Sequence, residues 1–515
     1  MNQHALDGSI ARSVGACIIS MAAPPAREGP GTIPLVASES ATMSKLYLRP
    51  KAGGRAGTLP RAPFASAERK TPRLFDPATQ PQGTGLPWPV ATFLVSLIIP
   101  WIVPVGPLSL APYRAVLMVA LLPCLVMWLS GRAGRIRPAD IGLILFCLWA
   151  WISIAVNHGL SAATEPGGIL FVETVGAYLL ARCYIRDADD FRNVTNLMVK
   201  LILLLFPFAV YEWITGSKPI LSAFGAIFPT VEITLNEPRW GFRRVQGPFI
   251  HPIMFGLFCG SLFALTHFVA DDGRTAASRR WLTAVVAGSV VLSMSSAPIA
   301  GLILQVAMIS WNWLLRQYES RWKILWGLLL AGYVVVELGS NQTPIQFYIH
   351  YFTFDKETGW FRLYIWEFGS ASVRNHPLFG IGFNDWVRPQ WMVPDSVDNF
   401  WLLTAMRHGM PALSLMLGSY LWIVIKVASK KIRDERMQNY RIAYLICMIT
   451  FFIGATTVHL WTAAYAWFLF LMGSGVWFFD TETGDSAAAR ASRSRHRSQS
   501  VRRTPTPAGC PNQKN

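Results

Sequence analysis

The pattern of hydrophobic and polar residues divides the chain into three parts. Between residues 88 and 480, long apolar runs alternate with polar segments, whereas residues 1–87 and 481–515 are small, polar and basic with little hydrophobic periodicity. A helix needs about 20 mostly apolar residues to cross the hydrocarbon core of a bilayer. We therefore expect a transmembrane domain over 88–480, a disordered basic extension over 1–87 and a disordered basic tail over 481–515.

Twelve apolar runs are long enough, or nearly so, to span a bilayer. The pattern thus predicts an all-α polytopic membrane protein with about 12 transmembrane helices, to within one or two. The expected spans are 89–105, 112–130, 140–157, 168–185, 196–215, 250–270, 281–297, 299–316, 323–339, 411–428, 440–459 and 461–479. The weakest boundary lies within 281–316, where residues 295–298 must form a tight turn.

Two polar segments, 216–249 and 339–410, are much longer than the others. The second is a large loop between the ninth and tenth spans, for which we expect helical segments, and its stretch from Gly359 to Ala412 is rich in charged and aromatic residues. A polar insert between apolar spans indicates a function at one side of the membrane.

Composition and charge give this domain an orientation. Charged residues make up 15% of the chain, against about 25% in soluble domains, and the net charge is +17. Lys and Arg concentrate in the tails and in short loops such as 131–138 and 271–280. With an even number of spans, these loops lie on the same side as both termini, which the distribution of Lys and Arg predicts to be cytoplasmic. Both long loops then lie on the outer side. No recognition motif accompanies the charge, so we expect no nucleic-acid binding.

Three arginines lie near the end of the first long outer loop. Arg239, Arg243 and Arg244 precede a span that begins near residue 250, with His251 at its start. Guanidinium groups suit phosphate because they offer planar, bidentate donors and keep their charge. Positive residues on the outer side oppose the usual trend, which favours a ligand such as a lipid-linked diphosphate over mere anchoring of the helix end. For His251, a packing role is the alternative to a chemical one.

The second long outer loop carries the other candidates. Arg362 and Trp366 are spaced to share one face of an amphipathic helix. Asp398 and His408 are ten residues apart, about 15 Å along a helix, so only one of them can act directly on a given reacting atom. A helix N-cap is the alternative role for Asp398. Arg114, at the outer start of the second span, is a further candidate contact for phosphate.

At these positions the sequence resembles the O-antigen ligase and polysaccharide polymerase superfamily of bacterial inner membranes. The resemblance rests on RVQGPFIHPIMFG at 244–256, FRLYIW at 361–366, HPLFGIG at 376–382 and DNFWLLTAMRHGMPA at 398–412. The last block is similar to the family's His-Asn signature, which is followed by a glycine hinge about nine residues later. Asn399, Gly409 and Ala412 fit that signature, whereas Asp398 stands where the family has a histidine. Since that histidine is a candidate base in the family, Asp398 is its natural substitute.

The resemblance implies a metal-independent membrane glycosyltransferase that needs no cofactor, because its donor arrives as an undecaprenyl-diphosphate-linked oligosaccharide. The chain has no Gly-rich nucleotide loop. The other implied partners are the growing polysaccharide, membrane lipids and other polysaccharide export proteins. The implied catalytic residues are Asp398, Arg244 and His408, and the implied substrate-binding residues are Arg243, Arg239, Arg362, His251, Asn399, Arg114 and Trp366.

The missing histidine favours a polymerase of exopolysaccharide or O-antigen repeat units over a ligase that attaches the glycan to a lipid. A transporter or flippase of lipid-linked sugars is the alternative from another class, although transporters usually show internal repeats and broken helices near the midplane. A scaffold role in an export complex also stays open.

Overall fold

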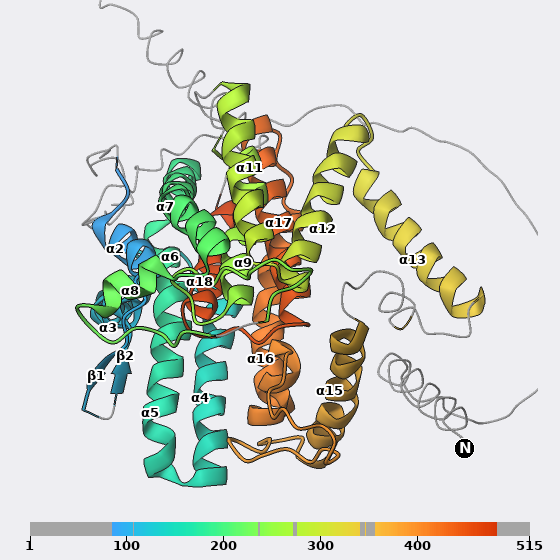
Figure 1. Ribbon diagram of the computed structural model, residues 1–515. Helices are drawn as coiled ribbons and strands as arrows, with labels where there is room; N and C mark the ends of the chain where they lie inside the picture. Colours follow the sequence, from blue (N-terminus) through green and yellow to red (C-terminus); the bar gives the residue numbers. More distant parts are fainter. Residues whose placement is uncertain are drawn as a thin grey trace, which may run out of the picture. The chain divides into compact units, whose positions relative to one another are not determined.

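The described part of the chain is mostly helical. The computed structural model describes residues 85–480 apart from 107, 235–236, 271–274, 340–345 and 347–355. The predicted basic tail, and the predicted extension up to residue 84, lie outside the described residues. The elements are α2 (Trp88–Ser96), β1 (Val103–Val105), β2 (Leu108–Leu110), α3 (Pro112–Leu129), α4 (Pro138–His158), α5 (Leu160–Phe171), the π-helical turn η2 (Val172–Gly176), α6 (Ala177–Tyr184), α7 (Ala188–Thr215), α8 (Pro219–Gly225), α9 (Pro252–Ser261), α10 (Phe263–Phe268), α11 (Ala276–Leu292), α12 (Ser296–Leu314), α13 (Arg321–Gly339), α15 (Lys356–Asn375), α16 (Phe400–Ser429), α17 (Glu435–Ala455), α18 (Thr462–Ser474) and the 3₁₀ turn η3 (Val476–Phe479) (Figure 1).

Seven helices among the described residues are long and apolar enough to cross a membrane: 112–129, 138–158, 188–215, 296–314, 321–339, 400–429 and 462–479. They define a multi-pass, mostly helical membrane protein, while the expected total of about 12 spans stays a prediction. Several other predicted spans are made of shorter pieces. Residues 160–184 form one helical run through the π-helical turn η2, and α9 and α10 share the span predicted at 250–270.

The first predicted span, 89–105, differs from the structure. Helix α2 ends at Ser96, and the chain then forms the antiparallel pair of β1 and β2, with Val103 opposite Leu110. Pro100 and Pro104 explain the difference, because proline cannot donate a helical hydrogen bond and disfavours helical geometry in the residue before it. Hydropathy alone does not register this interruption.

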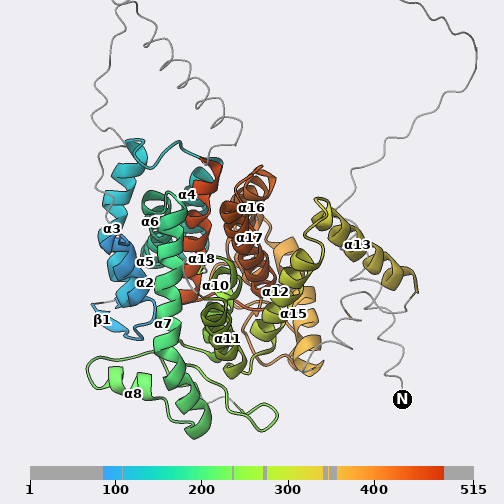
Figure 2. The ribbon, with the colours of Figure 1, turned by 90° about the horizontal axis from the view of Figure 1, so that it is seen from above.

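The most buried long helix lies in the middle of the bundle. Figure 2 shows α18 surrounded by α4, α6, α7, α10, α16 and α17. Of the apolar stretch 462–479, 89% is buried, as expected for a helix that is hydrophobic on all sides. Trp467 donates from Nε1 to Ser261 Oγ at 2.8 Å, which ties α18 to α9. At the periphery, α13 has no buried residue and presents its apolar side chains outwards, as a lipid-facing helix does.

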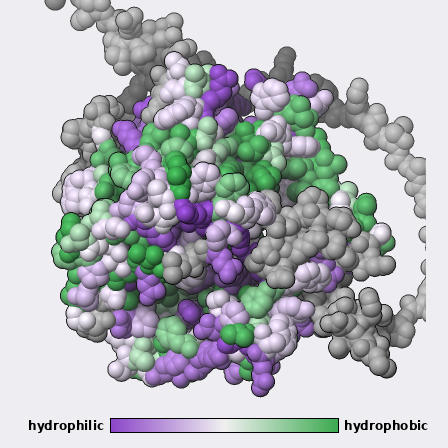
Figure 3. Space-filling model, in the orientation of Figure 1, coloured by the Kyte–Doolittle hydropathy of each residue, from purple (hydrophilic) through white to green (hydrophobic). Residues whose placement is uncertain are grey.

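The helix ends fall on two sides, which we call the basic side and the insert side. On the basic side, Arg436 Nη2 lies 2.8 Å from Asp189 Oδ1, and Lys430 Nζ donates to Phe479 O at 2.9 Å, joining the starts of α17 and α7 and the ends of α16 and η3. The insert side carries the α4–α5 turn and the segment between α15 and α16, at the bottom of Figure 1. Hydrophilic residues gather along this lower edge, and hydrophobic residues cover a broad area above it (Figure 3).

Candidate functional site

The site on the insert side is organised by a break in α16. Gly409 has φ 80° and ψ 173°, which are not helical, as expected for the predicted hinge at this position. Met410 N donates to Pro377 O at 2.8 Å instead of to a carbonyl of the helix, and Pro411 has no N–H to donate. The last carbonyl groups of the segment from Phe400 to His408 therefore need partners from elsewhere.

The HPLFGIG segment at 376–382 supplies two of these partners. Ile381 N donates to Met406 O at 2.8 Å, and Gly382 N donates to Arg407 O at 3.0 Å. Gly380 has φ +61°, and a Cβ there would lie 2.4 Å from Met406 O. Only glycine permits this close approach of two backbones. The segment is thus a structural turn that holds the end of the helix.

Side chains of helix α4 donate further hydrogen bonds where the HPLFGIG segment meets the break in α16, which we call the junction. Trp149 Nε1 donates to His408 O at 3.1 Å and to Leu378 O at 3.2 Å. Ser153 Oγ donates to Phe379 O at 2.5 Å and is 3.1 Å from Arg407 O. The backbone that carries Arg407 and His408 is therefore held by two other parts of the chain.

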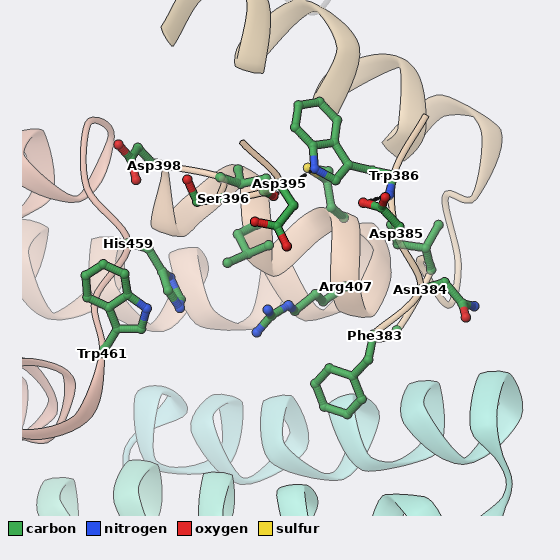
Figure 4. Close-up of a pocket in the computed structure, with 15 residues that line it drawn as sticks. Phe383, Asn384, Asp385, Trp386, Asp395, Ser396, Asp398, Arg407, His459 and Trp461 are labelled. Atoms are coloured by element: carbon green, nitrogen blue, oxygen red, sulfur yellow. Dashed lines mark hydrogen bonds between the residues drawn. The ribbon is translucent and has the colours of Figure 1, made fainter. Parts of the chain in front are cut away.

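A polar cavity of about 320 Å³ opens beside this junction (Figure 4). Its walls are the segments 381–386 and 395–398, the first turns of α16 and the connection between α17 and α18. Asp395, Asp398, Arg407, His459 and Trp461 are among the residues that line it. In Figure 4, Arg407 extends from α16 towards His459, which lies between Arg407 and Trp461.

A second cavity, also of about 320 Å³, lies next to the first and is mainly apolar. Its lining includes Phe146, Ile169, Leu170, Phe400 and Tyr465, together with the polar residues Arg114, Glu173 and His408. The two cavities share Phe383, Leu403, Arg407, His459 and Trp461. The guanidinium group of Arg407 and the imidazole of His459 therefore lie on a wall that the polar and the apolar cavity share.

Arg407 is the charged member of this shared wall. Its guanidinium lies over the ring of Phe383 at 5.6 Å, and its side chain makes no hydrogen bond or ion pair within the described ranges. A half-buried cation without a counter-ion is costly to keep, so this position favours an anionic ligand. No pattern in the sequence indicated a role for Arg407.

His459 is a second residue that the sequence analysis missed. Its buried Nδ1 atom has no hydrogen-bond partner among the residues that the structure describes. Burial and the positive charge of Arg407 lower the pKa of His459 to about 3, so the imidazole is neutral at physiological pH. The only signal in the sequence was the position of a histidine and Trp461 in a very short connection between two spans.

Asp398 faces the polar cavity and does not cap the helix. The N-cap of α16 is Asn399, whose Oδ1 accepts from Leu402 N at 3.0 Å. Asp398 is half-buried, and this burial raises the pKa of its carboxyl group, while the positive charge of Arg362 acts in the opposite direction. Arg362 is brought near by α15, where Ile365 packs with Met406 of α16. Arg362 is therefore close enough to influence the carboxyl group of Asp398.

Asp398 and His408, which are ten residues apart in the sequence, line different cavities. Asp398 borders the polar cavity, whereas His408 is buried and borders the apolar one. In the apolar cavity, Arg114 Nε lies 2.7 Å from Glu173 Oε1, which also accepts from Tyr113 Oη at 2.6 Å. The charge of Arg114 is thus already compensated.

The arginines of the first long polar segment, 216–249, lie outside both linings. Arg239 Nη1 donates to Ser296 Oγ at 3.1 Å, and Arg244 Nη2 donates to Ser295 Oγ at 3.2 Å, at the start of α12. Burial and the charge of Arg239 lower the pKa of Arg244 to about 10. Arg243 donates to the carbonyl oxygen of Ile214.

His251 and Trp366 have structural surroundings. His251 is the N-cap of α9, and its Nδ1 accepts from Ile253 N at 3.2 Å. Its ring lies 6.5 Å from that of Trp461, which lines both cavities. Trp366, on α15, is 42% exposed and lines neither cavity.

These helices and cavities define a multi-pass membrane protein with two adjoining cavities at the insert side of its helix bundle. A family model described as O-antigen ligase matches residues 281–417, which are 137 of the 515 residues. The match includes Arg362, Asp398 and Arg407, and it confirms the resemblance inferred from the sequence. It supports an enzyme of the O-antigen ligase and polymerase superfamily, whose members are membrane glycosyltransferase-like enzymes. No curated protein matches the chain significantly in sequence.

Proposed function

We propose that the protein is a polysaccharide polymerase of the bacterial inner membrane. It transfers a glycan from an undecaprenyl-diphosphate carrier to a sugar hydroxyl of an exopolysaccharide or O-antigen chain. The observation that carries the proposal is the pair of cavities that meet at Arg407 and His459. A lipid-linked donor has its parts in the same order: an apolar chain, a diphosphate and a polar glycan.

In this arrangement the apolar cavity receives the lipid end of the donor, and the diphosphate lies against Arg407. Arg407 is better suited to this role than Arg114, because Glu173 already compensates the charge of Arg114. Arg244 lines neither cavity and stays a predicted second phosphate contact. A guanidinium group placed where negative charge develops on the leaving diphosphate lowers the barrier to transfer.

The acceptor sugar occupies the polar cavity, and Asp398 acts as the base. The acceptor oxygen attacks the anomeric carbon of the donor sugar, Asp398 takes the hydroxyl proton, and the diphosphate leaves with the electrons of the broken C–O bond. Burial raises the pKa of Asp398, whereas His459 has a pKa of about 3. Since a base is most effective when its pKa lies near the working pH, Asp398 is the stronger candidate and His459 serves as a hydrogen-bonding group.

The orientation follows from the charges on the basic side. Arg132, Arg135, Arg137 and Arg186 lie in its connections, together with Lys430. Cytoplasmic loops carry the excess of Lys and Arg, so the basic side faces the cytoplasm and the insert side faces the periplasm. Both termini are then cytoplasmic, and the domain limits expected from the sequence, 88 and 480, stand as part of this proposal.

The glycan profile of a deletion strain tests the proposal. We expect loss of long chains, with single lipid-linked repeat units accumulating on the outer leaflet. Complete chains that remain on their carrier would instead indicate a ligase, the second candidate, which the description of the matched family favours. Repeat units accumulating on the inner leaflet would indicate a flippase.

The base assignment predicts a pH dependence. Asp398 must be ionised to accept a proton, so transfer should fall as the pH is lowered through its pKa. Because burial raises that pKa, the fall should begin above the range of an ordinary aspartate, whose pKa is about 3.9. Arg362→Gln removes a charge that lowers the pKa and should move the acid limb to higher pH. The measurement is the rate of polymer formation by the purified protein, from about pH 4 to pH 8, with lipid-linked oligosaccharide.

Arg374→Gln provides the matched control, because Arg374 lies on the same helix and its guanidinium is 3.3 Å from Ser370 Oγ. An acid limb at the same pH in Arg362→Gln and in the wild type would contradict the assignment of Asp398 as the base.

A further inference from the structure

A third cavity, of about 410 Å³, lies at the basic side, at the opposite ends of the helices from Asp398. It is formed where the ends of α10, α11, α12, α13 and α17 meet. We call it the arginine cavity, because its lining includes Arg279, Arg316 and Arg321. Neither the family match nor the proposed transfer reaction gives this cavity a role.

The charge of the lining is positive. Its three arginines face one carboxylate, that of Glu435, and His267 is the remaining titratable group. Glu435 makes no ion pair within the part of the chain that the structure describes, so it does not neutralise any of the arginines by direct contact. The cavity therefore favours an anion.

Arg321 and Arg316 differ in how they are held. Arg321 donates from Nε to Asn312 Oδ1 at 2.9 Å and from Nη1 to Tyr318 O at 3.2 Å, which fixes its side chain at the start of α13. Arg316 is exposed, and its side chain has no hydrogen bond in the described ranges. One guanidinium is thus prepositioned, while the other is available for a ligand.

The rest of the lining is suited to a lipid. Phe268, Ile309, Trp313 and Ile442 form an apolar wall, and Trp313, near the end of α12, is 71% exposed. Tryptophan is enriched at membrane–water interfaces. The buried Oε1 atom of Gln438 has no donor among the described residues, so it can accept from a hydroxyl group. The cavity thus offers cationic donors, an apolar wall and a polar acceptor in one place.

We propose that the arginine cavity binds the phosphate of an anionic phospholipid headgroup, such as that of phosphatidylglycerol. Guanidinium groups hold phosphate oxygens through paired N–H donors. Basic pockets between transmembrane helices on the cytoplasmic side are the usual sites for anionic headgroups. A soluble phosphate has the same charged group, but it leaves the apolar wall uncovered.

Native mass spectrometry of the full-length protein in detergent tests this site, with phosphatidylglycerol and phosphatidylcholine as probes. We expect the wild type to retain phosphatidylglycerol in preference to phosphatidylcholine. Arg316→Gln should weaken this retention about fivefold, and adding Arg321→Gln should weaken it further by a similar factor. Since Arg316 has no hydrogen bond to lose, the single variant measures binding without disturbing the fold.

Arg280→Gln is the matched control, because Arg280 neighbours Arg279 on α11 but is exposed and outside the lining. It should bind phosphatidylglycerol as the wild type does. Equal retention of phosphatidylglycerol by the wild type and Arg316→Gln would overturn the proposal. Thermal stabilisation by inorganic phosphate but not by phosphatidylglycerol would overturn the lipid assignment.

Discussion

Asp398→Asn should reduce glycan transfer by about a hundredfold or more while the protein remains in the membrane. Asparagine has nearly the same size and keeps one carbonyl acceptor, but it cannot take the proton of the acceptor hydroxyl. Asp398 is half-buried on the wall of the polar cavity and does not cap α16, so the substitution should spare the helix. The measurement is the rate of polymer formation by equal amounts of membrane-inserted protein.

Asp395→Asn is the control for this prediction. Asp395 lines the same cavity and is exposed, whereas the carboxyl group of Asp398 is half-buried. We expect Asp395→Asn to retain most of the activity. Polymer of normal length made at the normal rate by Asp398→Asn would refute its role as the base and would direct attention to His459.

Gly409→Ala should destabilise the folded protein by about 3 kcal/mol or more. The φ of Gly409 is 80°, and a Cβ atom there would lie 1.9 Å from Leu378 O, so the HPLFGIG segment would have to move away. The hydrogen bonds from Ile381 and Gly382 to the end of the helix would be lost with that movement. Since the same backbone carries Arg407, transfer should be lost as well. Thermal unfolding of the purified protein in detergent measures the effect.

Gly418→Ala is the matched control, because Gly418 lies in the same helix and a Cβ atom there would meet nothing within 4 Å. This control should be neutral, or stabilising by up to about 1 kcal/mol, since alanine favours the helix more than glycine does. Similar unfolding temperatures for the two variants would show that the junction at Gly409 tolerates a side chain.

Local patterns in the sequence were sufficient to predict several parts of the structure. The apolar runs predicted a helical membrane protein, because crossing a bilayer requires long apolar helices whatever their neighbours are. The glycine hinge of the family signature predicted the break in α16 at Gly409. Its physical basis is local, because the backbone freedom of Gly409 and the missing N–H of Pro411 are properties of the residues themselves. The spacing of Asp398 and His408 indicated that they cannot both act on one reacting atom, and the two residues line different cavities.

Where two local structures were both compatible with the residues, the sequence did not decide between them. Asp398 and Asn399 are both good N-cap residues, and the cap at Asn399 follows from where the chain enters α16. Hydropathy placed a span at 89–105, yet the prolines at 100 and 104 turn that stretch into a short helix followed by a strand pair. In both cases the composition of the stretch left the local structure open, and the backbone geometry of single residues decided it.

The site itself was decided by tertiary structure. Arg407 and His459 are 52 positions apart in sequence, and they share a wall only because the connection between α17 and α18 packs against the first turns of α16. Arg239 and Arg244 carry the same charge as Arg407, but they point to the start of α12 and outside the linings of both cavities. By itself, the sequence determined the membrane-spanning class, the hinge and the polar insert, because these depend on neighbouring residues. Which charges face a cavity depends on how distant helices pack, and no local pattern records that packing.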